Sequence, residues 1–327
     1  MKTFKRAFIT GIAGSGGSYL AEHILDNVPG VEVGGTSRWH STTTPRNLNR
    51  IKDKIDLFSC DLTDLGRITR ILDQYRPDVI FHIASLANVR DSFDNPIAVI
   101  NNNINITLNL LEAVRILKEQ SDYNPVIQLC STSEVYGDVD PDNVPINESC
   151  PIQPVNPYAS SKLCQDNLGL VYYKSFGLNI IRTRMFTYLN ARRTDLFATA
   201  FAKQIVEIEK GEKDILRHGN LESVRTLIDV RDAADSYWIA AVAGIPGEVY
   251  NIGGEYPVKV GEFLEQLKKF SSVEIKSEVN PDLLRPVDVT LQIPDCTKFR
   301  DHTGWKPKYK LAESVEFFLK EIKLIYG

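Results

Sequence analysis

Short apolar runs of four to six residues recur along the first half of the chain. Apolar residues occupy consecutive positions in these runs, a pattern typical of strands that are covered on both faces of a parallel sheet. We therefore expect strands at 7–10, 31–36, 55–60, 79–83, 126–130 and 179–183.

Stretches with helical spacing of apolar residues separate these runs, and we expect helices at 18–27, 65–74, 103–117 and 158–176. Repeated strand–helix–strand units predict an α/β fold with a doubly wound parallel sheet. The second half is less regular, with helices expected at 196–210 and 261–270. A proline-rich stretch, 281–294, is expected to be a loop that reaches across a cleft.

Composition narrows the class of protein. The 327 residues include 38 Lys and Arg against 42 Asp and Glu, a net charge of −4, and 43% are hydrophobic. These values argue against a disordered chain and against nucleic acid as the main partner. We expect no membrane span, because no apolar run reaches about 18 residues, and no signal peptide, because the first residues lead directly into a strand pattern.

The five cysteines are widely spaced and form no Cys-x-x-Cys pair. This pattern argues against a disulfide framework and against a zinc site, and it fits a reducing cytoplasm. We therefore expect a cytoplasmic protein with no metal centre.

A glycine-rich turn follows the first expected strand and opens the first helix. Gly11, Gly14 and Gly17 permit a tight turn and close approach of a pyrophosphate to free N–H groups at the helix N-terminus. The alternative is an ordinary loop, but the strand–turn–helix context favours dinucleotide binding. The glycine spacing resembles that of the extended branch of the short-chain dehydrogenase/reductase family.

The end of the second strand bears on the choice of cofactor. An acidic residue at this point would bind the ribose hydroxyls of NAD, but the chain has Arg38. Because a guanidinium pairs well with a 2′-phosphate, we expect NADP; the alternative is a solvated surface arginine. In the family that the chain resembles, Asp61 and Leu62 stand where adenine is contacted, and the alternative for them is a loop cap.

Tyr158 and Lys162 lie one helical turn apart after the fifth strand. A neighbouring lysine cation would favour the tyrosinate form, as acid–base catalysis requires. Thr132 lies at the carboxyl end of that strand, where its hydroxyl would hold the reacting oxygen. Asn103 is expected to open the helix after the fourth strand and resembles the family's structural asparagine; the alternative is a helix cap.

Glu134 distinguishes between reactions. Alcohol–ketone redox needs no carboxylate, whereas removal of a proton next to a carbonyl requires a base placed close to the substrate. The alternative is a loop charge without a role in chemistry.

Different segments of the chain resemble two different enzymes of this family. Similarity to GDP-mannose 4,6-dehydratase lies in Gly17-Ser18-Tyr19-Leu20, Asp61-Leu62-Thr63-Asp64, Ser131-Thr132-Ser133-Glu134 and Arg192-Arg193. Similarity to the GDP-4-keto-6-deoxy-mannose reductase lies in 201–206, 219–225 and 284–288. The chain departs from both at 187–190 and at Thr226, and from the dehydratase at Leu196, which bears on the identity of the hexose.

The resemblance implies an NADP-binding Rossmann domain at 1–186, to which part of 220–250 returns, and a smaller α/β lobe at 187–327. This lobe would bind a GDP-sugar substrate, with Arg225 and Arg285 as ligands of the diphosphate and ribose. It also implies a homodimer or homotetramer. Apolar residues beyond one core stripe on the helices after strands four and five agree with a dimer.

Our first hypothesis is therefore a GDP-sugar 4,6-dehydratase that recycles NADP internally. In it Thr132, Tyr158 and Lys162 serve the redox steps and Glu134 removes the C5 proton. The second is a reductase of the 4-keto sugar that consumes NADPH. A third is a nucleotide-binding protein without turnover, against which the intact Thr132, Tyr158 and Lys162 weigh.

Overall fold

The computed structural model describes residues 2–39, 45–284 and 289–327. Its central sheet has seven strands: β1 (Arg6–Thr10), β2 (Glu32–Ser37), β3 (Ile55–Ser59), β4 (Val79–His82), β5 (Val126–Thr132), β6 (Asn179–Met185) and β11 (Val249–Ile252). They lie in the order β11-β6-β5-β4-β1-β2-β3, and every neighbouring pair is parallel. This arrangement confirms the predicted doubly wound α/β fold.

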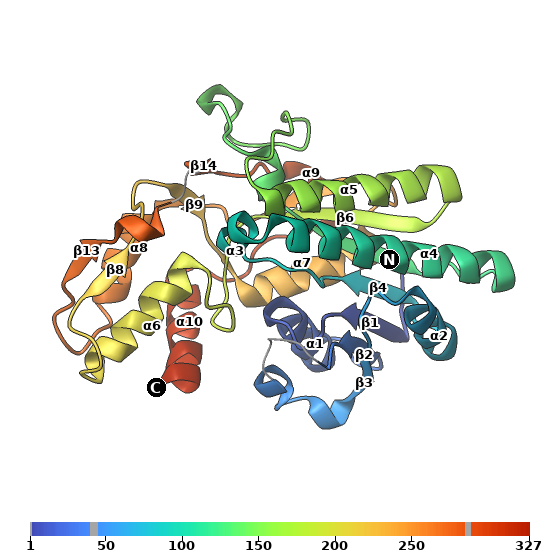
Figure 1. The fold of residues 1–327 in the computed structure, drawn as a ribbon, viewed down its shortest axis with the longest axis horizontal. Helices are drawn as coiled ribbons and strands as arrows, with labels where there is room; N and C mark the ends of the chain where they lie inside the picture. The colour runs from blue at the N-terminus through green and yellow to red at the C-terminus, as the bar shows by residue number, and fades with distance from the viewer. Residues whose placement is uncertain (1, 40–44, 285–288) are drawn as a thin grey trace.

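Helices cover both faces of this sheet (Figure 1). One face carries α1 (Ser15–Asn27) and α7 (Val230–Ala243); the other carries α2 (Leu65–Tyr75), α4 (Pro96–Ser121) and α5 (Pro157–Phe176). Successive strand residues point to opposite faces, so Ala7 and Ile9 join one buried cluster and Phe8 joins the other. Both faces are therefore apolar, which explains the uninterrupted apolar runs in the sequence.

Helix α4 begins at Pro96, well before the expected start at residue 103. Proline is favoured at the first turn of a helix because its missing N–H would have no partner there. Asn103 consequently lies inside the helix, and the expectations that it opens or caps the helix are wrong. Its buried side chain accepts a hydrogen bond from Leu86 N and donates one to Ser161 Oγ on α5.

The remaining strands are short and form small sheets. They are β7 (Tyr188–Leu189) with β10 (Ile228–Asp229), β12 (Pro257–Lys259) with β9 (Val224–Thr226) and β14 (Leu291–Gln292), and β13 (Ser277–Val279) with β8 (Leu216–His218). Within 281–294, expected to be a loop, strand β14 pairs with β9 instead.

A separate buried cluster joins α6 (Phe197–Glu209), α8 (Val260–Lys268) and α10 (Leu311–Tyr326) into a second lobe, on the left of Figure 1. Shorter helices are α3 (Val89–Asp94), α9 (Thr297–Thr303), η1 (Pro45–Leu48), η2 (Lys52–Lys54), η3 (Ser133–Tyr136), η4 (Pro141–Asn143) and η5 (Pro281–Leu283).

The chain crosses between the two parts more than once. After the short strands β7 to β10, α7 packs against α1 and β11 pairs with β6 in the central sheet. The chain then returns to the second lobe at β12 and α8. In the part of the chain that the structure describes, no helix has the length and apolarity needed to cross a membrane.

Candidate active site

A cleft of about 2030 Å³ runs along the carboxyl ends of the parallel strands and continues to the second lobe. This is the edge of an open α/β sheet at which ligands bind. The predicted site residues that line it are Gly11, Gly14, Gly17, Arg38, Asp61, Leu62, Thr132, Glu134, Tyr158, Lys162 and Arg225. Arg285 lies outside the described residues.

The glycine turn is folded too tightly on its own backbone to hold side chains at its glycine positions. Gly11 has a φ of +67°, a conformation that favours glycine. A Cβ at Gly17 would lie only 2.5 Å from Gly11 O. Helix α1 begins after Gly14, and among the described residues no side chain caps it. Its first N–H groups and the positive end of its dipole therefore fit a pyrophosphate.

Arg38 follows β2, is half-buried, and faces the cleft, as does Arg46 of η1. Asp61 accepts hydrogen bonds from Thr63 N at 2.9 Å and from Thr63 Oγ1 at 2.8 Å. It therefore caps this turn, while Asp61 and the buried Leu62 also line the cleft. The adenine contact of Asp61 and Leu62 stays a prediction.

Tyr158 and Lys162 lie at the start of α5, and both are buried. Burial raises the pKa of Tyr158, whereas the positive charge of Arg193 and a hydrogen bond with Thr132 act to lower it. Lys162 Nζ donates to Cys130 O, and burial lowers the pKa of Lys162. The cation with the largest lowering effect on Tyr158 is thus Arg193, which the sequence analysis did not assign to catalysis.

Glu134 lies in η3, directly after β5, and its side chain is held in place. Thr132 Oγ1 accepts a hydrogen bond from Glu134 N at 3.3 Å. Asn156 Nδ2 donates to Glu134 Oε2 at 3.0 Å, while Asn156 Oδ1 accepts from Ala159 N at 2.7 Å and caps α5. Asn156 therefore fixes the carboxylate relative to the helix that carries Tyr158. An asparagine before Pro157 was the available signal for this cap.

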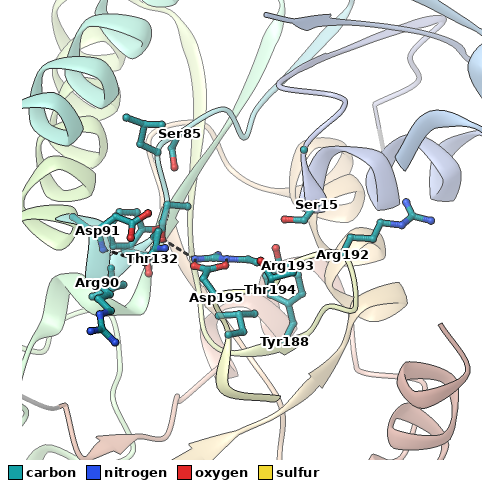
Figure 2. A pocket seen from close by; sticks show the side chains of 18 of the residues that line it. Ser15, Ser85, Arg90, Asp91, Thr132, Tyr188, Arg192, Arg193, Thr194 and Asp195 are labelled. Carbon is teal, nitrogen blue, oxygen red and sulfur yellow. Dashed lines mark hydrogen bonds and ion pairs between the residues drawn. The ribbon is translucent and has the colours of Figure 1, made fainter. Parts of the chain in front are cut away.

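The loop after β7 contributes residues to the cleft that sequence reasoning missed. Arg193 Nη2 donates to Ala87 O at 2.7 Å, and Arg193 Nε contacts Asp195 Oδ1 at 2.9 Å. Figure 2 shows Arg193 and Asp195 side by side, with the guanidinium extending toward the side of the cleft where Thr132 lies. Burial disfavours the charge of Arg193, but Asp195 raises the pKa of the guanidinium, so it stays protonated.

Arg225 of β9 lies in the part of the cleft formed by the second lobe. Its Nη1 donates to Val224 O at 2.9 Å, and its Nη2 donates to Val289 O. These hydrogen bonds direct the guanidinium at backbone carbonyls of β9 and of the segment that leads into β14.

Comparison with known proteins identifies a family that matches nearly the whole chain. A protein-family model described as GDP-mannose 4,6 dehydratase matches residues 8–317. A GDP-mannose 4,6-dehydratase of Sordaria araneosa is 29% identical over 345 residues, which cover 98% of this chain and 62% of that longer protein. A GDP-6-deoxy-D-mannose reductase of Pseudomonas aeruginosa is 27% identical over 319 residues, covering 97% of each chain.

The fold also matches a solved structure, that of RMD from Pseudomonas aeruginosa complexed with NADPH. The TM-score is 0.83 at 24% identity, and the match covers 98% of this chain and 99% of the other. This likeness establishes the arrangement of the elements, and the family match rests on the sequence.

Proposed function

The chain belongs to the GDP-mannose 4,6-dehydratase family, and from this premise we propose that it is a GDP-sugar 4,6-dehydratase with GDP-mannose as substrate. The observation that carries the proposal is the position of Glu134, whose carboxylate shares one cleft with Thr132, Tyr158 and Lys162. A reductase would need the last three residues alone.

The cofactor in this proposal is NADP, held by the glycine turn, the open N-terminus of α1 and Arg38. NADP⁺ supplies a hydride acceptor for C4 and, once reduced, the hydride that returns to C6, so it is not consumed. Tyr158 takes the proton of the 4-hydroxyl, and Thr132 hydrogen-bonds the same oxygen. The resulting ketone acidifies the C5 proton, which Glu134 removes and delivers to the departing 6-hydroxyl as water leaves. When the hydride returns to C6, the proton that Tyr158 took from the 4-hydroxyl is returned to C5, so Tyr158 and Glu134 both end the cycle in their starting state.

The second lobe would bind the GDP moiety. We propose Arg225 and Arg285 as its diphosphate and ribose ligands, because a guanidinium suits both groups. We also propose the division into a cofactor-binding part at 1–186, with residues from 220–250 returning to it, and a substrate lobe at 187–327. The helical cluster of α6, α8 and α10 supports this division.

A dimer through α4 and α5 is part of the same proposal. These helices pack side by side, and Ile104, Leu108 and Leu170 are half-buried while Tyr173 is exposed. Light scattering at micromolar concentration should show at least a dimer. A monomer would contradict this point without bearing on the reaction.

The second candidate is an NADPH-dependent reductase of a GDP-4-keto-6-deoxy sugar. It is favoured by the reductase of Pseudomonas aeruginosa, which matches this chain over 97% of both sequences. The two reactions differ in stoichiometry, because the reductase consumes one NADPH per sugar.

The decisive experiment supplies GDP-mannose with substoichiometric NADP⁺ and follows products by mass spectrometry. A dehydratase removes one water per sugar over many turnovers. The Glu134→Gln variant should still oxidise C4, so that bound NADPH accumulates and is detected by its absorbance, but it should form little dehydrated product. Glu119→Gln, on the exposed part of α4, is the matched control. Wild type that leaves GDP-mannose unchanged but consumes NADPH with a GDP-4-keto sugar would establish the reductase instead.

A further inference from the structure

The side chain of Asn156 makes a separate contact with each of its two polar atoms. Its Oδ1 accepts a hydrogen bond from Ala159 N at 2.7 Å and so caps α5, the helix that carries Tyr158. Its Nδ2 donates to Glu134 Oε2 at 3.0 Å. Only the first contact is needed to begin a helix, because serine and aspartate are equally good caps. The contact with Glu134 therefore needs another explanation.

Asn156 lies behind the wall of the cleft, whereas Glu134 forms part of that wall. Asn156 is only 7% exposed, so little water competes with its amide. Glu134 is half-buried and lines the cleft. Its Oε2 is occupied by Asn156, while Oε1 has no hydrogen bond within the parts of the chain that the structure describes. The oxygen left for a substrate proton is therefore Oε1.

The backbone of η3 is held by contacts that do not involve Asn156. Tyr136 OH donates to Asn251 Oδ1 at 2.8 Å and accepts from Arg184 Nη1 at 2.9 Å. Arg184 Nε in turn donates to Asp166 Oδ2, on α5, at 2.9 Å. Loss of the Asn156 amide should therefore release the carboxylate that η3 carries while the backbone of η3 stays in place.

A carboxylate that acts as a base must reach one particular C–H bond, and rotation of a free side chain would carry it away from that bond. A misplacement of about 1 Å can cost about 10²-fold in rate. A neighbouring cation would also fix a carboxylate, but an opposite charge stabilises the ionised form and makes the base weaker. A neutral amide donor orients the base with a smaller loss of basicity.

We propose that Asn156 is the positioning residue for proton abstraction: its amide holds Oε2 of Glu134, so that Oε1 faces the sugar and removes the C5 proton. The C5–H bond breaks, the proton passes to Oε1, and the electron pair moves onto the C4 carbonyl oxygen as an enolate. This inference rests on the proposed function, in which Glu134 is the C5 base. It assigns the reacting oxygen and adds a residue that acts through Glu134 alone.

The first test uses two variants that keep the helix cap and lose the donor. In Asn156→Ser the shorter side chain no longer reaches Glu134, and in Asn156→Asp the group that faces Glu134 is an oxygen that cannot donate. Both should melt close to wild type, because serine and aspartate cap helices as well as asparagine. With GDP-mannose, kcat should fall about 10- to 100-fold, while KM and NADP affinity stay unchanged. Oxidation at C4 precedes the abstraction, so bound NADPH should accumulate.

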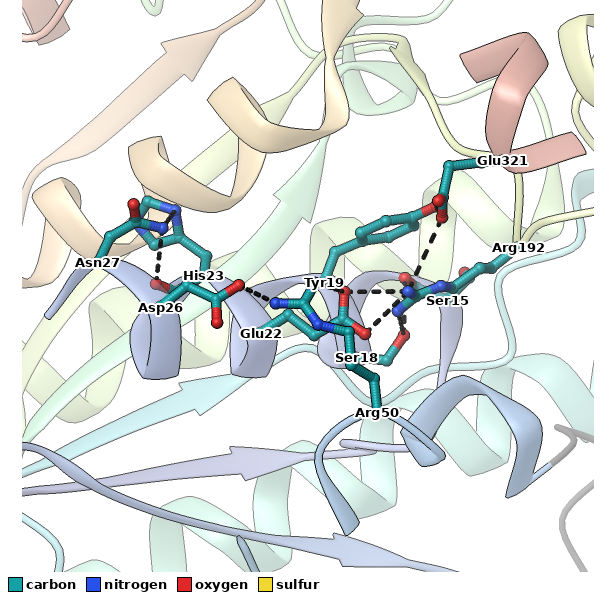
Figure 3. Close-up of polar contacts among 10 residues, drawn as sticks. All are labelled: Ser15, Ser18, Tyr19, Glu22, His23, Asp26, Asn27, Arg50, Arg192 and Glu321. Atoms are coloured by element: carbon teal, nitrogen blue, oxygen red, sulfur yellow. Dashed lines mark hydrogen bonds and ion pairs between the residues drawn. The ribbon is translucent and has the colours of Figure 1, made fainter. Parts of the chain in front are cut away.

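The matched control is Asn27→Ser. Asn27 Nδ2 donates to His23 O at 3.0 Å at the far end of α1, as Figure 3 shows. This change should leave kcat and KM as in wild type. Asn156→Ala removes cap and donor together, so it should show the same kinetic defect and a melting temperature lower by about 2 °C. Wild-type kcat in Asn156→Ser and Asn156→Asp would overturn the inference and leave Asn156 as a helix cap only.

A second readout does not require dehydration. In D₂O and with NADP⁺ bound, GDP-4-keto-6-deoxy-mannose cannot be reduced, but Glu134 should exchange its C5 hydrogen for deuterium, which mass spectrometry detects. Exchange should be about 10- to 100-fold slower in Asn156→Ser and Asn156→Asp. It should fall to the uncatalysed rate in Glu134→Gln and stay unchanged in Asn27→Ser.

The exchange experiment separates the two proposals. Exchange as fast in Asn156→Ser as in wild type, or wild-type exchange no faster than the uncatalysed rate, would overturn the inference. If GDP-mannose is not dehydrated but exchange at C5 depends on Glu134 and Asn156, the proposed function fails and the inference stands.

Discussion

The cofactor-binding part and the second lobe prepare for their ligands by different means. Around the glycine turn, the groups that would meet a phosphate are backbone N–H groups of α1, fixed by a buried helix on a seven-stranded sheet. In the second lobe the equivalent group is the side chain of Arg225, which already donates to backbone carbonyls of Val224 and Val289. The first site is therefore preorganised, whereas a ligand in the second must share or replace existing hydrogen bonds.

The strands that support the two sites also differ in length. Strands of the central sheet are four to seven residues long, whereas β7 and β10 have two residues each and, within the described parts of the chain, form a two-stranded sheet of their own. Sheets of two short strands contribute little stability by themselves. The lobe therefore depends on the helical core of α6, α8 and α10, and we expect it to adapt to substrate while the cofactor site stays fixed.

The largest effect is expected where the two parts meet, at Tyr158. Tyr158→Phe keeps the ring packing and removes the acid–base group, so turnover should fall by about 10²–10⁴. NADP affinity, measured by calorimetry, should be preserved because the glycine turn is elsewhere. Tyr256→Phe, at a tyrosine that is 68% exposed and lies outside α4 and α5, is the control. Near-normal turnover in Tyr158→Phe would remove this residue from the mechanism.

Preorganisation of the cofactor site is tested by Gly17→Ala. The new Cβ would lie 2.5 Å from Gly11 O, a backbone atom that cannot move without distorting the turn. We expect a loss of about 1–3 kcal/mol, the usual scale of overpacking, divided between NADP affinity and the free energy of unfolding. Gly66→Ala, on α2 where a Cβ meets nothing closer than 3.5 Å, should be neutral or stabilising. Equal behaviour of the two variants would mean that the turn is not constrained.

Arg38→Ala should weaken NADP(H) binding by about 1–3 kcal/mol, the scale of a charge-assisted hydrogen bond. NAD(H) binding should change little, because NAD lacks the 2′-phosphate. Titration of both cofactors by fluorescence measures this difference. The same loss for NAD(H) and NADP(H) would contradict the assignment of Arg38.

Acid should weaken the sheet that carries the cofactor site. His82 is buried between Thr10 and Thr107, and burial lowers its pKa from 6.5 to about 3. Between these values the unfolded chain binds the extra proton, so stability is complete above about pH 6.5 and falls as the pH drops toward 3. The slope from this group is at most about 1.4 kcal/mol per pH unit.

Urea unfolding at several pH values tests this dependence. In His82→Gln the contribution disappears, so the difference in free energy of unfolding from wild type should shrink between pH 7 and pH 5. A difference that stays constant with pH would show that His82 does not titrate on unfolding in this range.

The smallest effect is expected in the second lobe. Arg225→Gln should raise KM for the GDP-sugar by up to about tenfold, the lower end of what a charged hydrogen bond contributes. The kcat value and the NADP affinity should change little, because the reacting atoms and the cofactor lie elsewhere. A fall in kcat without a change in KM would mean that Arg225 stabilises the structure of the lobe and does not bind substrate.

Features that depend on local sequence were predictable. The apolar runs predict six of the seven central strands because both faces of that sheet are buried, whereas β11 was not predicted. The glycine turn follows from backbone sterics alone. Tyr158 and Lys162 share a helix, so their spacing predicts their common face. Each of these features is decided within a few residues of the chain.

Features that depend on contacts between distant segments were not predictable. Arg193 reaches the cleft because β7 and the loop after it pass α1, and nothing in its own sequence indicates this position. The strands β7 and β10 are too short to show a periodicity of two. Asn103 was misplaced because the apolar spacing did not reveal that α4 begins at Pro96, where a proline supports the first turn.

The return of the chain to the central sheet has a consequence for how the protein can be divided. A fragment that ends at residue 186 would lack α7 and β11, so β6 would become an open edge and the apolar surface under Tyr237 and Ala241 would be uncovered. Such a fragment should aggregate during expression. Exchange of substrate lobes between homologues would accordingly require several splice points, on both sides of the segment from Val230 to Ile252.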